Sequence, residues 1–365
     1  MKSNYDVLGN HIRLVDFRNR DLITQNVLGI NIDKYFMPSV ANVIGTDLSK
    51  YKLIRKGLFA CNPMHVGRDE RLPVALYTEE DPAIVSPAYF MFEVIDNKIL
   101  NEEFLMLWFK RPEFDRICWL KTDGSVRGGI SWDDICRIEV PILPMEEQQK
   151  IVKAYKTIND RIALKKRIND NLAAIMLTEF QKRFSSFKKN VLEGIESDGW
   201  KQDSLSLLTD FQYGKMVPES DRLEKGYPIF SGYGITGYYS DYMFADPTIV
   251  VLARGVSGTG DVRISPKYSY ITNLSIALKL KNPLYFSYLY VYLKNDNLRA
   301  LDSGSAQSMI TVDSLSRHKI AIPPKDVAAS YDRFAKKLLN TIHKNEEEMD
   351  KLSILSKSML SILSR

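Results

Sequence analysis

The sequence predicts an α+β protein with two mixed β-rich domains in a pseudo-two-fold repeat, separated by two long antiparallel coiled-coil helices. Three observations support this prediction: a line of sequence that occurs twice, a helical periodicity after each copy, and strand-like runs before each copy. The chain has 365 residues. Because single hydrophobic cores rarely grow beyond about 250–300 residues, this length also favours two domains.

The repeated line is the strongest of these observations. Residues 124–144 read GSVRGGISWDDICRIEVPILP, and residues 304–324 read GSAQSMITVDSLSRHKIAIPP. The two lines align without a gap at an offset of 180 residues. The identical pairs are Gly124/Gly304, Ser125/Ser305, Ile130/Ile310, Asp133/Asp313, Arg137/Arg317, Ile142/Ile322 and Pro144/Pro324. An offset kept over this length indicates an internal duplication.

A long amphipathic helix is predicted after each copy of the line. From residue 146 to 184, apolar residues recur at helical spacing and form a seam that polar residues interrupt once. The seam consists of Ile151, Tyr155, Ile158, Ile162, polar Lys165 and Asn169, then Leu172 and Met176. Adding 180 to the first seven positions gives Tyr331, Ala335, Leu338, Ile342, polar Asn345, Met349 and Leu352, and Met359 follows seven residues later. Because a whole domain separates the two helices in the chain, we expect them to pack antiparallel.

Strand-like runs bounded by Gly and Pro fill the segments before each helix. In the first segment they are YKLIRKGLFACNP, RLPVALYT and AIVSPAYFMFEVI, followed by a predicted helix NEEFLMLWFKRPEF at 101–114. In the second they are YPIFSGYG, TIVVLARG and LSIALKLK, followed by PLYFSYLYVYLKND at 283–296. The predicted domain limits are therefore 1–144, 145–189, 190–324 and 325–365.

The charge and apolar content limit the classes of protein. The net charge is +5, and the excess lies in residues 146–189, which hold eleven basic and five acidic residues. Bulk charge therefore does not mark either β-rich domain as a nucleic-acid binder. No apolar run is long enough to cross a bilayer, and the N-terminus lacks the apolar stretch of a secretory signal. Three cysteines without CxxC spacing fit a cytoplasmic protein.

Short patterns that would suggest catalysis are better explained as turns. GYGITG at 232–237 fits a dinucleotide-binding spacing and FSGYG at 230–234 fits a methyl-donor pattern, but no helical period follows either of them. We therefore expect a β-turn there. Asp81, Asp96 and Lys98 match a permissive nuclease spacing, and Asp96 begins a natural turn. Cys61 and His65 are too few for a zinc site, so no metal site is predicted.

Local clusters of basic and amide side chains are the better candidates for function. Arg pairs bidentately with guanine, Asn and Gln pair with adenine, and Lys contacts phosphates. Arg127 and Gln307 occupy equivalent positions in the two copies of the repeated line. The candidate DNA-binding residues are Lys56, Arg68, Arg71, Lys121, Arg127, Lys215, Arg254, Arg263, Lys267 and Gln307. On the outward face of the first long helix, Lys165, Lys166 and Arg167 are candidates for binding a partner protein.

The chain resembles the specificity subunit of type I restriction-modification systems. The local match is IEVPILPMEEQQKIV at 138–152, where prolines precede EEQ and a long helix, and SPAYFMF at 86–92 resembles a strand of the family's recognition domain. The order of domain, Gly-Ser line, prolines and helix, repeated once, extends the resemblance over the chain. The second copy, AIPPKDVAASYDRF, keeps the prolines and lacks EEQ.

The resemblance implies a subunit that is not itself an enzyme. Each domain would be a target recognition domain that reads one half of a bipartite site in double-stranded DNA, and the helices would set their separation. Two methyltransferase subunits per chain and restriction-translocase subunits would dock on it. They would carry the adenine chemistry, the methyl donor, ATP and Mg²⁺, so this chain needs no cofactor. Two alternatives stay open: a degenerate or fused DNA methyltransferase or nuclease, and a coiled-coil scaffold with no role at DNA.

Overall fold

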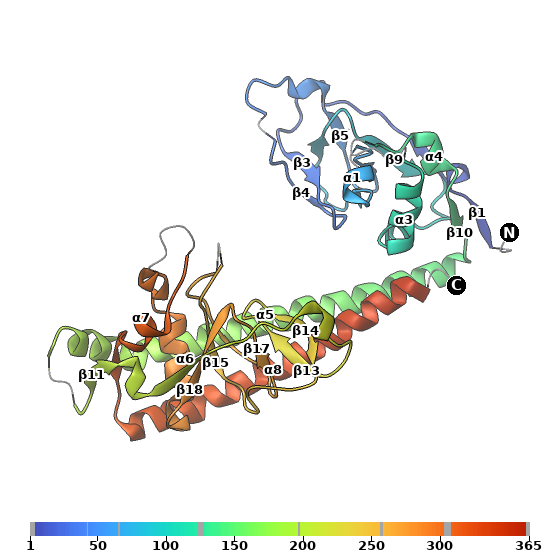
Figure 1. The fold of residues 1–365 in the computed structure, drawn as a ribbon. Helices are drawn as coiled ribbons and strands as arrows, with labels where there is room; N and C mark the ends of the chain where they lie inside the picture. Colours follow the sequence, from blue (N-terminus) through green and yellow to red (C-terminus); the bar gives the residue numbers. More distant parts are fainter. Residues whose placement is uncertain are drawn as a thin grey trace. The chain divides into compact units, whose positions relative to one another are not determined.

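The computed structural model describes residues 4–41, 43–64, 66–122, 128–195, 198–255, 258–302 and 308–362, which pack as two units. Unit 1 consists of residues 1–164 and 348–365, and unit 2 of residues 165–347. Each unit contains part of both long helices, α5 (Met145–Leu192) and α8 (Lys325–Ile362), green and red in Figure 1. The two units are divided where the packing divides, within the long helices. The domain limits drawn from the sequence lie at the ends of those helices, so they are a different division and stay a prediction.

Unit 1 begins with short strands and ends in helices. Its strands are β1 (Tyr5–Val7), β2 (Ile12–Leu14), β3 (Val27–Ile30), β4 (Phe36–Pro38), β5 (Lys52–Ile54), β6 (Phe59–Cys61), β7 (Val74–Leu76), β8 (Ala83–Val85), β9 (Phe90–Val94) and β10 (Glu139–Pro141). Its α-helices before α5 are α1 (Val66–Asp69), α2 (Glu102–Phe109), α3 (Pro112–Leu120) and α4 (Trp132–Cys136). The strands form sheets of order β2-β9-β6-β7 and β4-β3-β8-β5, and β1 pairs with β10.

Unit 2 contains a similar series of elements. Its strands are β11 (Lys201–Ser204), β12 (Thr209–Tyr213), β13 (Tyr227–Phe230), β14 (Ile235–Tyr239), β15 (Ile249–Leu252), β16 (Val262–Ile264), β17 (Tyr270–Ile271), β18 (Ser275–Leu280) and β19 (Lys319–Ile322). Its α-helices before α8 are α6 (Phe286–Lys294) and α7 (Val312–Ser316). The sheets have the orders β12-β18-β15-β16 and β14-β13-β17, and β11 pairs with β19.

The two units share their pattern of strand pairing. The larger sheet of unit 2 reproduces the order of the sheet β2-β9-β6-β7, with β15 in the place of β6. In the other sheet, β3 pairs antiparallel with β4 and parallel with β8, just as β13 pairs antiparallel with β14 and parallel with β17. The pairs β1–β10 and β11–β19 are both antiparallel. Corresponding strands therefore have corresponding neighbours in the two units.

The central strands β6 and β15 are buried on both faces. In β6, Phe59 and Cys61 pack against the helices of unit 1, whereas Ala60 packs in the second apolar cluster with residues of β8. In β15, Val251 and Val250 likewise point into different clusters. Because side chains alternate along a strand, an uninterrupted apolar run is what a strand covered on both faces requires. This explains the apolar runs LFAC and TIVVLA in the sequence.

The segment predicted as one helix before the repeated line forms two helices in the structure. The sequence predicted a single helix over 101–114, but α2 ends at Phe109 and α3 begins at Pro112. Arg111 has an extended backbone, φ −76° and ψ 139°, as the residue before a proline prefers. Proline is well suited to the first turn of the new helix, where its missing N–H costs no hydrogen bond. The second helix, α3, carries Asp115, which accepts a hydrogen bond from Lys34 between β3 and β4.

The start of α5 is fixed by Gln148, the glutamine of the EEQ motif. Gln148 is fully buried, and its amide group accepts a hydrogen bond from Asn101 N at 2.8 Å. Its Nε2 donates to Ile99 O at 2.8 Å and to Leu143 O at 2.7 Å. Asn101 is also the N-cap of α2, accepting from Phe104 N. One side chain therefore joins the beginnings of α2 and α5.

Unit 2 uses different side chains at the equivalent place. The residue 180 positions after Gln148 is Ala328, which is fully buried and makes no side-chain hydrogen bond. Instead, Asp332 of α8 accepts a hydrogen bond of 2.6 Å from Ser287 Oγ of α6. The Tyr285 hydroxyl donates to Pro323 O at 3.0 Å. The missing EEQ of the second copy therefore changes the contacts that hold its long helix.

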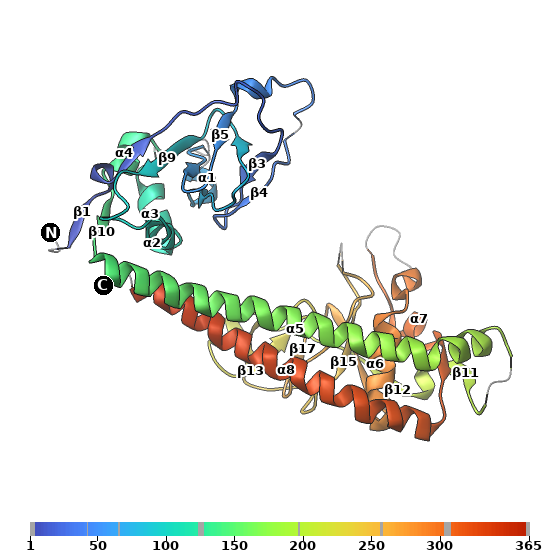
Figure 2. The same ribbon diagram turned by 180° about the vertical axis from the view of Figure 1, so that it is seen from behind.

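In both units the segments of α5 and α8 lie side by side and run in opposite directions (Figure 2). In unit 2, Tyr331 donates to Met176 O at 2.9 Å, and Asn345 donates to Asn169 Oδ1 at 2.7 Å. Lys165 donates to Asn345 Oδ1 at 2.9 Å. These are residues of the predicted seam, and every predicted seam position is buried or partly buried.

In unit 1 the remaining segments of the two helices are also joined. Asn159 donates to Ser356 Oγ at 3.3 Å, and Arg161 forms an ion pair with Glu348. α5 continues to Leu192, three residues beyond the limit at residue 189 that was drawn from the sequence. No helix in the described ranges combines the length and the apolar character that a membrane crossing needs.

We predict that Phe184→Ala destabilises unit 2 strongly. The Phe184 ring is 2% exposed and packs against Trp200, Tyr288 and Tyr331 with ring centroids 5.2–5.6 Å apart. Its removal leaves a cavity that costs about 3–5 kcal/mol of the free energy of unfolding. Urea unfolding of the full chain, followed by circular dichroism, measures the change. The exposed control Leu284→Ala should stay within about 0.5 kcal/mol of the parent. Equal effects of the two variants would contradict the prediction.

Candidate nucleic-acid interface

In unit 1 the loop that follows β6 is joined to the segment that follows the repeated Gly-Ser. Ile130 N donates to Pro63 O at 3.1 Å, and Gly67 N donates to Gly128 O at 2.9 Å. A Cβ at Gly129 would lie 3.1 Å from Pro63 O, so glycine permits this close approach. Arg68, a predicted DNA contact, lies on α1 within this loop.

Unit 2 has the same arrangement after β15. Ile310 N donates to Ala253 O at 2.9 Å, and Arg254 forms a bridge with Met309. Asp302 accepts a hydrogen bond of 2.7 Å from Met309 N. Pro63 and Ala253 thus receive bonds from Ile130 and Ile310, which are equivalent residues of the repeat. In each unit, two segments far apart in the sequence form one loop surface, which we call the paired-loop surface.

Two of the predicted DNA contacts, Arg127 and Gln307, lie outside the described residues, as does His65. The described residues nearest to them in sequence, Gly128 and Ser308, belong to the paired-loop surfaces of their units. Arg254 is exposed on the surface of unit 2. Lys121 ends α3 and is partly buried. The structure therefore brings Arg68 and Arg254 to the same kind of loop surface, each in its own unit.

Four of the predicted cations make ion pairs with carboxylates. Arg68 pairs with Asp69 at 2.6 Å and Lys56 pairs with Glu80. These partners raise the pKa values of both basic groups above their usual values. The remaining pairs are Arg71–Asp33 at 3.1 Å and Arg263–Asp261 at 2.7 Å. An exposed pair contributes little stability, but a carboxylate fixes the direction in which a guanidinium group points.

Asp261 has two cationic partners, Arg263 and Lys294 of α6. Burial tends to raise the pKa of Asp261, but the hydrogen bond and charge of Lys294, with Arg263, bring that pKa below its usual value. Lys215 and Lys267 are exposed, and no acidic partner is found for either among the described residues. Lys267 precedes Tyr268, whose ring contacts Tyr227 and Tyr242. Unit 2 thus combines unpaired cations and exposed aromatic rings.

The partner-binding candidates differ among themselves. Lys165 is partly buried and bonds Asn345 of the other long helix, whereas Lys166 and Arg167 are exposed. Exposed apolar residues, Ile168 and Ile175, follow on the same helix. Lys166 and Arg167 therefore remain available to a partner, and Lys165 contributes to the seam.

The rejected catalytic patterns lie in turns and strands. The Asp96 carboxylate accepts a hydrogen bond of 2.8 Å from Lys98 N, which closes a turn. The glycines of GYGITG lie in the turn before β14 and in that strand itself, so no helix follows them, as the sequence predicted. In the described ranges, no group of three or more His, Cys, Asp or Glu side chains could hold a metal ion.

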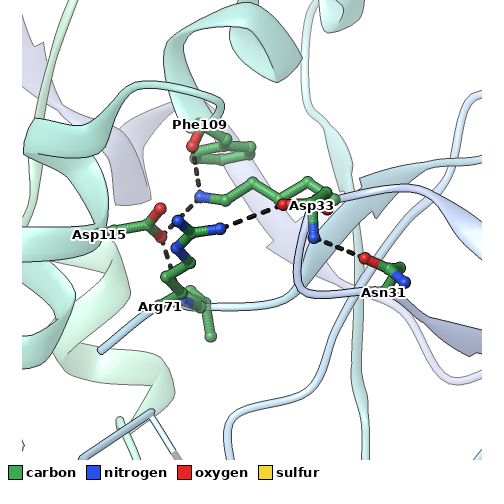
Figure 3. A network of polar contacts seen from close by, with 7 residues as sticks. Asn31, Asp33, Arg71, Phe109 and Asp115 are labelled. Carbon is green, nitrogen blue, oxygen red and sulfur yellow. Dashed lines mark hydrogen bonds and ion pairs between the residues drawn. The ribbon is translucent and has the colours of Figure 1, made fainter. Parts of the chain in front are cut away.

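A buried lysine that the sequence did not reveal fixes the tip of the β3–β4 hairpin (Figure 3). The Lys34 side chain is 4% exposed, and its Nζ donates to Phe109 O at 2.5 Å and to Asp115 Oδ1 at 2.7 Å. The same carboxylate oxygen accepts from Leu72 N at 3.1 Å. Burial lowers the pKa of Lys34, and the charge of Asp115 opposes this shift. Such burial is tolerable only because both charges are paired.

The same network reaches a predicted DNA contact. Asp33, next to Lys34 in the hairpin tip, pairs with Arg71, and its N–H donates to Asn31 Oδ1 at 2.8 Å. Lys34 has φ +68°, a left-handed conformation that costs a lysine free energy and persists only where surrounding contacts enforce it. The hairpin tip, α3 and the segment of Arg71 are therefore joined by one network of polar contacts.

The fold and the paired-loop surfaces define a protein of two similar α+β units on two long helices. Residues 73–174 and 198–352, more than half of the chain, match the family of the type I restriction modification DNA specificity domain. The chain belongs to this family. It is 21% identical over 389 residues to a Methanocaldococcus jannaschii protein named "Putative type I restriction enzyme MjaX specificity subunit", covering 99% of this chain and 88% of the relative.

The fold is also found in a solved structure. The crystal structure of the S subunit of a type I restriction-modification system from M. genitalium covers 98% of this chain, and the match covers 95% of that subunit. The TM-score is 0.62 and the sequence identity is 16%. At this identity the likeness shows a shared fold, and the residues that contact DNA must come from this chain itself.

We predict that Lys34→Met destabilises unit 1 by about 3–5 kcal/mol, because it leaves the Asp115 carboxylate buried without its cation. Adding Asp115→Asn should recover much of the loss, because asparagine removes the charge and keeps an oxygen for Leu72 N. Urea unfolding of the single and double variants measures both effects. A single variant as stable as the parent would show that the buried pair does not hold the hairpin.

Proposed function

We propose that this chain is the DNA sequence-specificity subunit of a type I restriction-modification complex. Each unit reads one half of a bipartite target in double-stranded DNA, and the chain itself is non-catalytic. The observation that carries the proposal is the equal strand pairing of two units, each with a paired-loop surface after its central strand. Family membership over both halves of the chain supports it.

A two-fold arrangement of the two long helices follows from the same proposal. Lys165 and Asn345 are 180 residues apart, the offset of the repeat, and they hydrogen-bond each other. In a two-fold arrangement, a contact between equivalent residues lies at the axis. Two half-sites read from one side of a duplex lie roughly 34–36 Å apart, about one helical turn. α5 alone extends roughly 72 Å at 1.5 Å per residue, so helices of this length can span such a gap.

The cations of the two units are better suited to contacting specific bases than to binding DNA tightly through its phosphates. Arg68, Arg71 and Arg263 are oriented by carboxylates, and an oriented guanidinium group can pair bidentately with guanine. Lys215, Lys267 and Arg254 are exposed and suit phosphate contacts. Because four of the candidate cations already pair with carboxylates, the isolated chain should bind DNA weakly and with little selectivity, since phosphate neutralisation supplies most non-specific affinity.

Partner subunits would supply what this chain lacks. Methyltransferase subunits, two per chain, would dock on the long helices, where Lys166 and Arg167 lie beside exposed Ile168 and Ile175. An apolar strip with a cationic rim is suited to a partner helix. The methyltransferases would carry the methyl donor and the adenine chemistry, and restriction-translocase subunits would use ATP and Mg²⁺.

The test of this function is the methylation pattern of DNA from cells that express this chain with its methyltransferase partner. We expect methylated adenines within a two-part sequence with an unspecified spacer, and no methylation when the chain is omitted. Cells that express the methyltransferase with an unrelated specificity subunit provide the control. A single uninterrupted methylated sequence, or methylation independent of this chain, would contradict the proposal.

We also predict that longer helices change only the spacer. Inserting seven residues after Leu164 in α5 and seven after Glu347 in α8, where the two units divide, lengthens the antiparallel helices at the same level and keeps the seam within each unit in register, because seven residues are nearly two turns. Each helix gains roughly 10 Å, so the spacer should grow by up to about three base pairs at 3.4 Å each. Sequencing of methylated sites measures both half-sites and the spacer. The same insertion at exposed Asn97 is the control, and changed half-sites would refute the role of the helices as a spacer.

A further inference from the structure

The turn between β13 and β14 presents one aromatic side chain, Tyr233. Ser231 N donates to Gly234 O at 3.0 Å, and Tyr233 N donates to Ser231 Oγ at 3.2 Å. Ser275 Oγ of β18 donates to Ser231 O at 2.9 Å, which ties the turn to the larger sheet. Gly232 has φ +81°, a conformation that favours glycine. The backbone that carries Tyr233 is therefore fixed on both sides.

The Tyr233 ring rests on two glycines of the loop after β15. A Cβ at Gly255 would lie 2.0 Å from the Tyr233 hydroxyl, and a Cβ at Gly258 would lie 2.7 Å from the ring and from the hydroxyl. No side chain fits between this ring and the backbone beneath it. Tyr233 nevertheless remains 55% exposed. The structure thus packs the hydroxyl end of the ring against the loop backbone and leaves more than half of the side chain exposed.

This ring belongs to the paired-loop surface of unit 2. Gly255 follows Arg254, which forms a bridge with Met309, close in sequence to Gln307. The ring therefore lies at the loop that carries an exposed, predicted DNA contact. Ala253, the first residue of this loop, is fully buried, so the loop is anchored where it leaves β15.

In unit 1 the tip of the β3–β4 hairpin, which corresponds to the β13–β14 turn, is held by ion pairs instead of an aromatic ring. There, Asp33 pairs with Arg71, which follows the loop after β6, and Lys34 is buried against Asp115. Both units therefore join the tip of the hairpin to the chain segment that follows the central strand. Unit 1 uses charges for this contact and unit 2 uses an aromatic ring.

We propose that Tyr233 is a specificity-determining residue whose exposed ring contacts the bases and sugars of the half-site that unit 2 reads. This inference rests on the proposed function and names a contact within it. A ring that is already immobilised loses little conformational entropy on binding, so its contact contributes fully to affinity. Apolar contacts of this kind distinguish the thymine methyl group and follow the sugar surface.

The test compares Tyr233→Ala, Tyr233→Phe and the control Tyr238→Ala, which removes an exposed tyrosine elsewhere on the same hairpin. Each full chain is assembled with its methyltransferase, and methylation is measured on duplexes of the parental target and on genomic DNA. We expect Tyr233→Ala to lower the rate on the parental target by roughly tenfold or more. We also expect it to change base preference only in the half-site of unit 2. Tyr233→Phe and Tyr238→Ala should resemble the parent.

A second variant tests whether the glycine loop positions the ring. Gly258→Ala places a methyl group against the Tyr233 ring, so it should reproduce part of the Tyr233→Ala defect. In the Tyr233→Ala background it should add little, because no ring is left to displace. A full additional loss in that background would overturn the positioning role of Gly258.

The outcomes separate this inference from the function on which it rests. If the parental complex methylates no two-part sequence, the proposed function fails and the inference with it. If the parental complex methylates such a sequence and Tyr233→Ala leaves rate and base preference unchanged, only the inference about Tyr233 is refuted. Normal assembly of the variant with the methyltransferase, checked by size-exclusion chromatography, ensures that a lost rate reflects DNA contact.

Discussion

The contact between α5 and α8 is the constraint on which the rest of this structure depends. Apolar side chains provide most of the helix–helix packing, but they would tolerate a shift of one helix along the other. The polar group formed by Lys165, Asn169 and Asn345 does not, because a shift would leave buried amide groups without partners. A polar interruption in an apolar seam is a known means of fixing register. Register matters here because each unit contains part of both helices.

The attachment of each unit to its long helix shows how a duplicated fold can diverge. Gln148 makes three hydrogen bonds at the start of α5, and the equivalent Ala328 makes none through its side chain. Unit 2 instead uses Asp332 and Ser287, which lie on the corresponding elements α8 and α6, one turn further along the long helix. The elements and their packing are therefore kept while the polar contacts are exchanged. The absence of EEQ in one copy is consistent with this exchange and leaves the architecture intact.

The parts of the fold that depend on local periodicity could be predicted from the sequence. The seam residues and the start of α5 after Pro144 follow from spacing and from the preferences of helix ends, and the structure confirms them. The break at Arg111 was missed, although Pro112 was a visible signal. The burial of Lys34 could not be predicted, because Asp115 lies 81 residues away and a lysine beside Asp33 resembles an exposed residue. Contacts of this kind depend on which loops the fold brings together.

The candidate interface also combines residues that the repeat identifies with contacts that only the fold creates. The equivalence of Arg127 and Gln307 was readable from the repeat, whereas the contact of Tyr233 with Gly255 depends on a hairpin and a loop that meet only in the folded unit. The low net charge of each unit is then understandable. Arg68 and Arg263 each carry a carboxylate beside them, which cancels bulk charge and also fixes the direction of the guanidinium group. A surface built in this way gains little affinity from phosphates and depends on geometry for its selectivity.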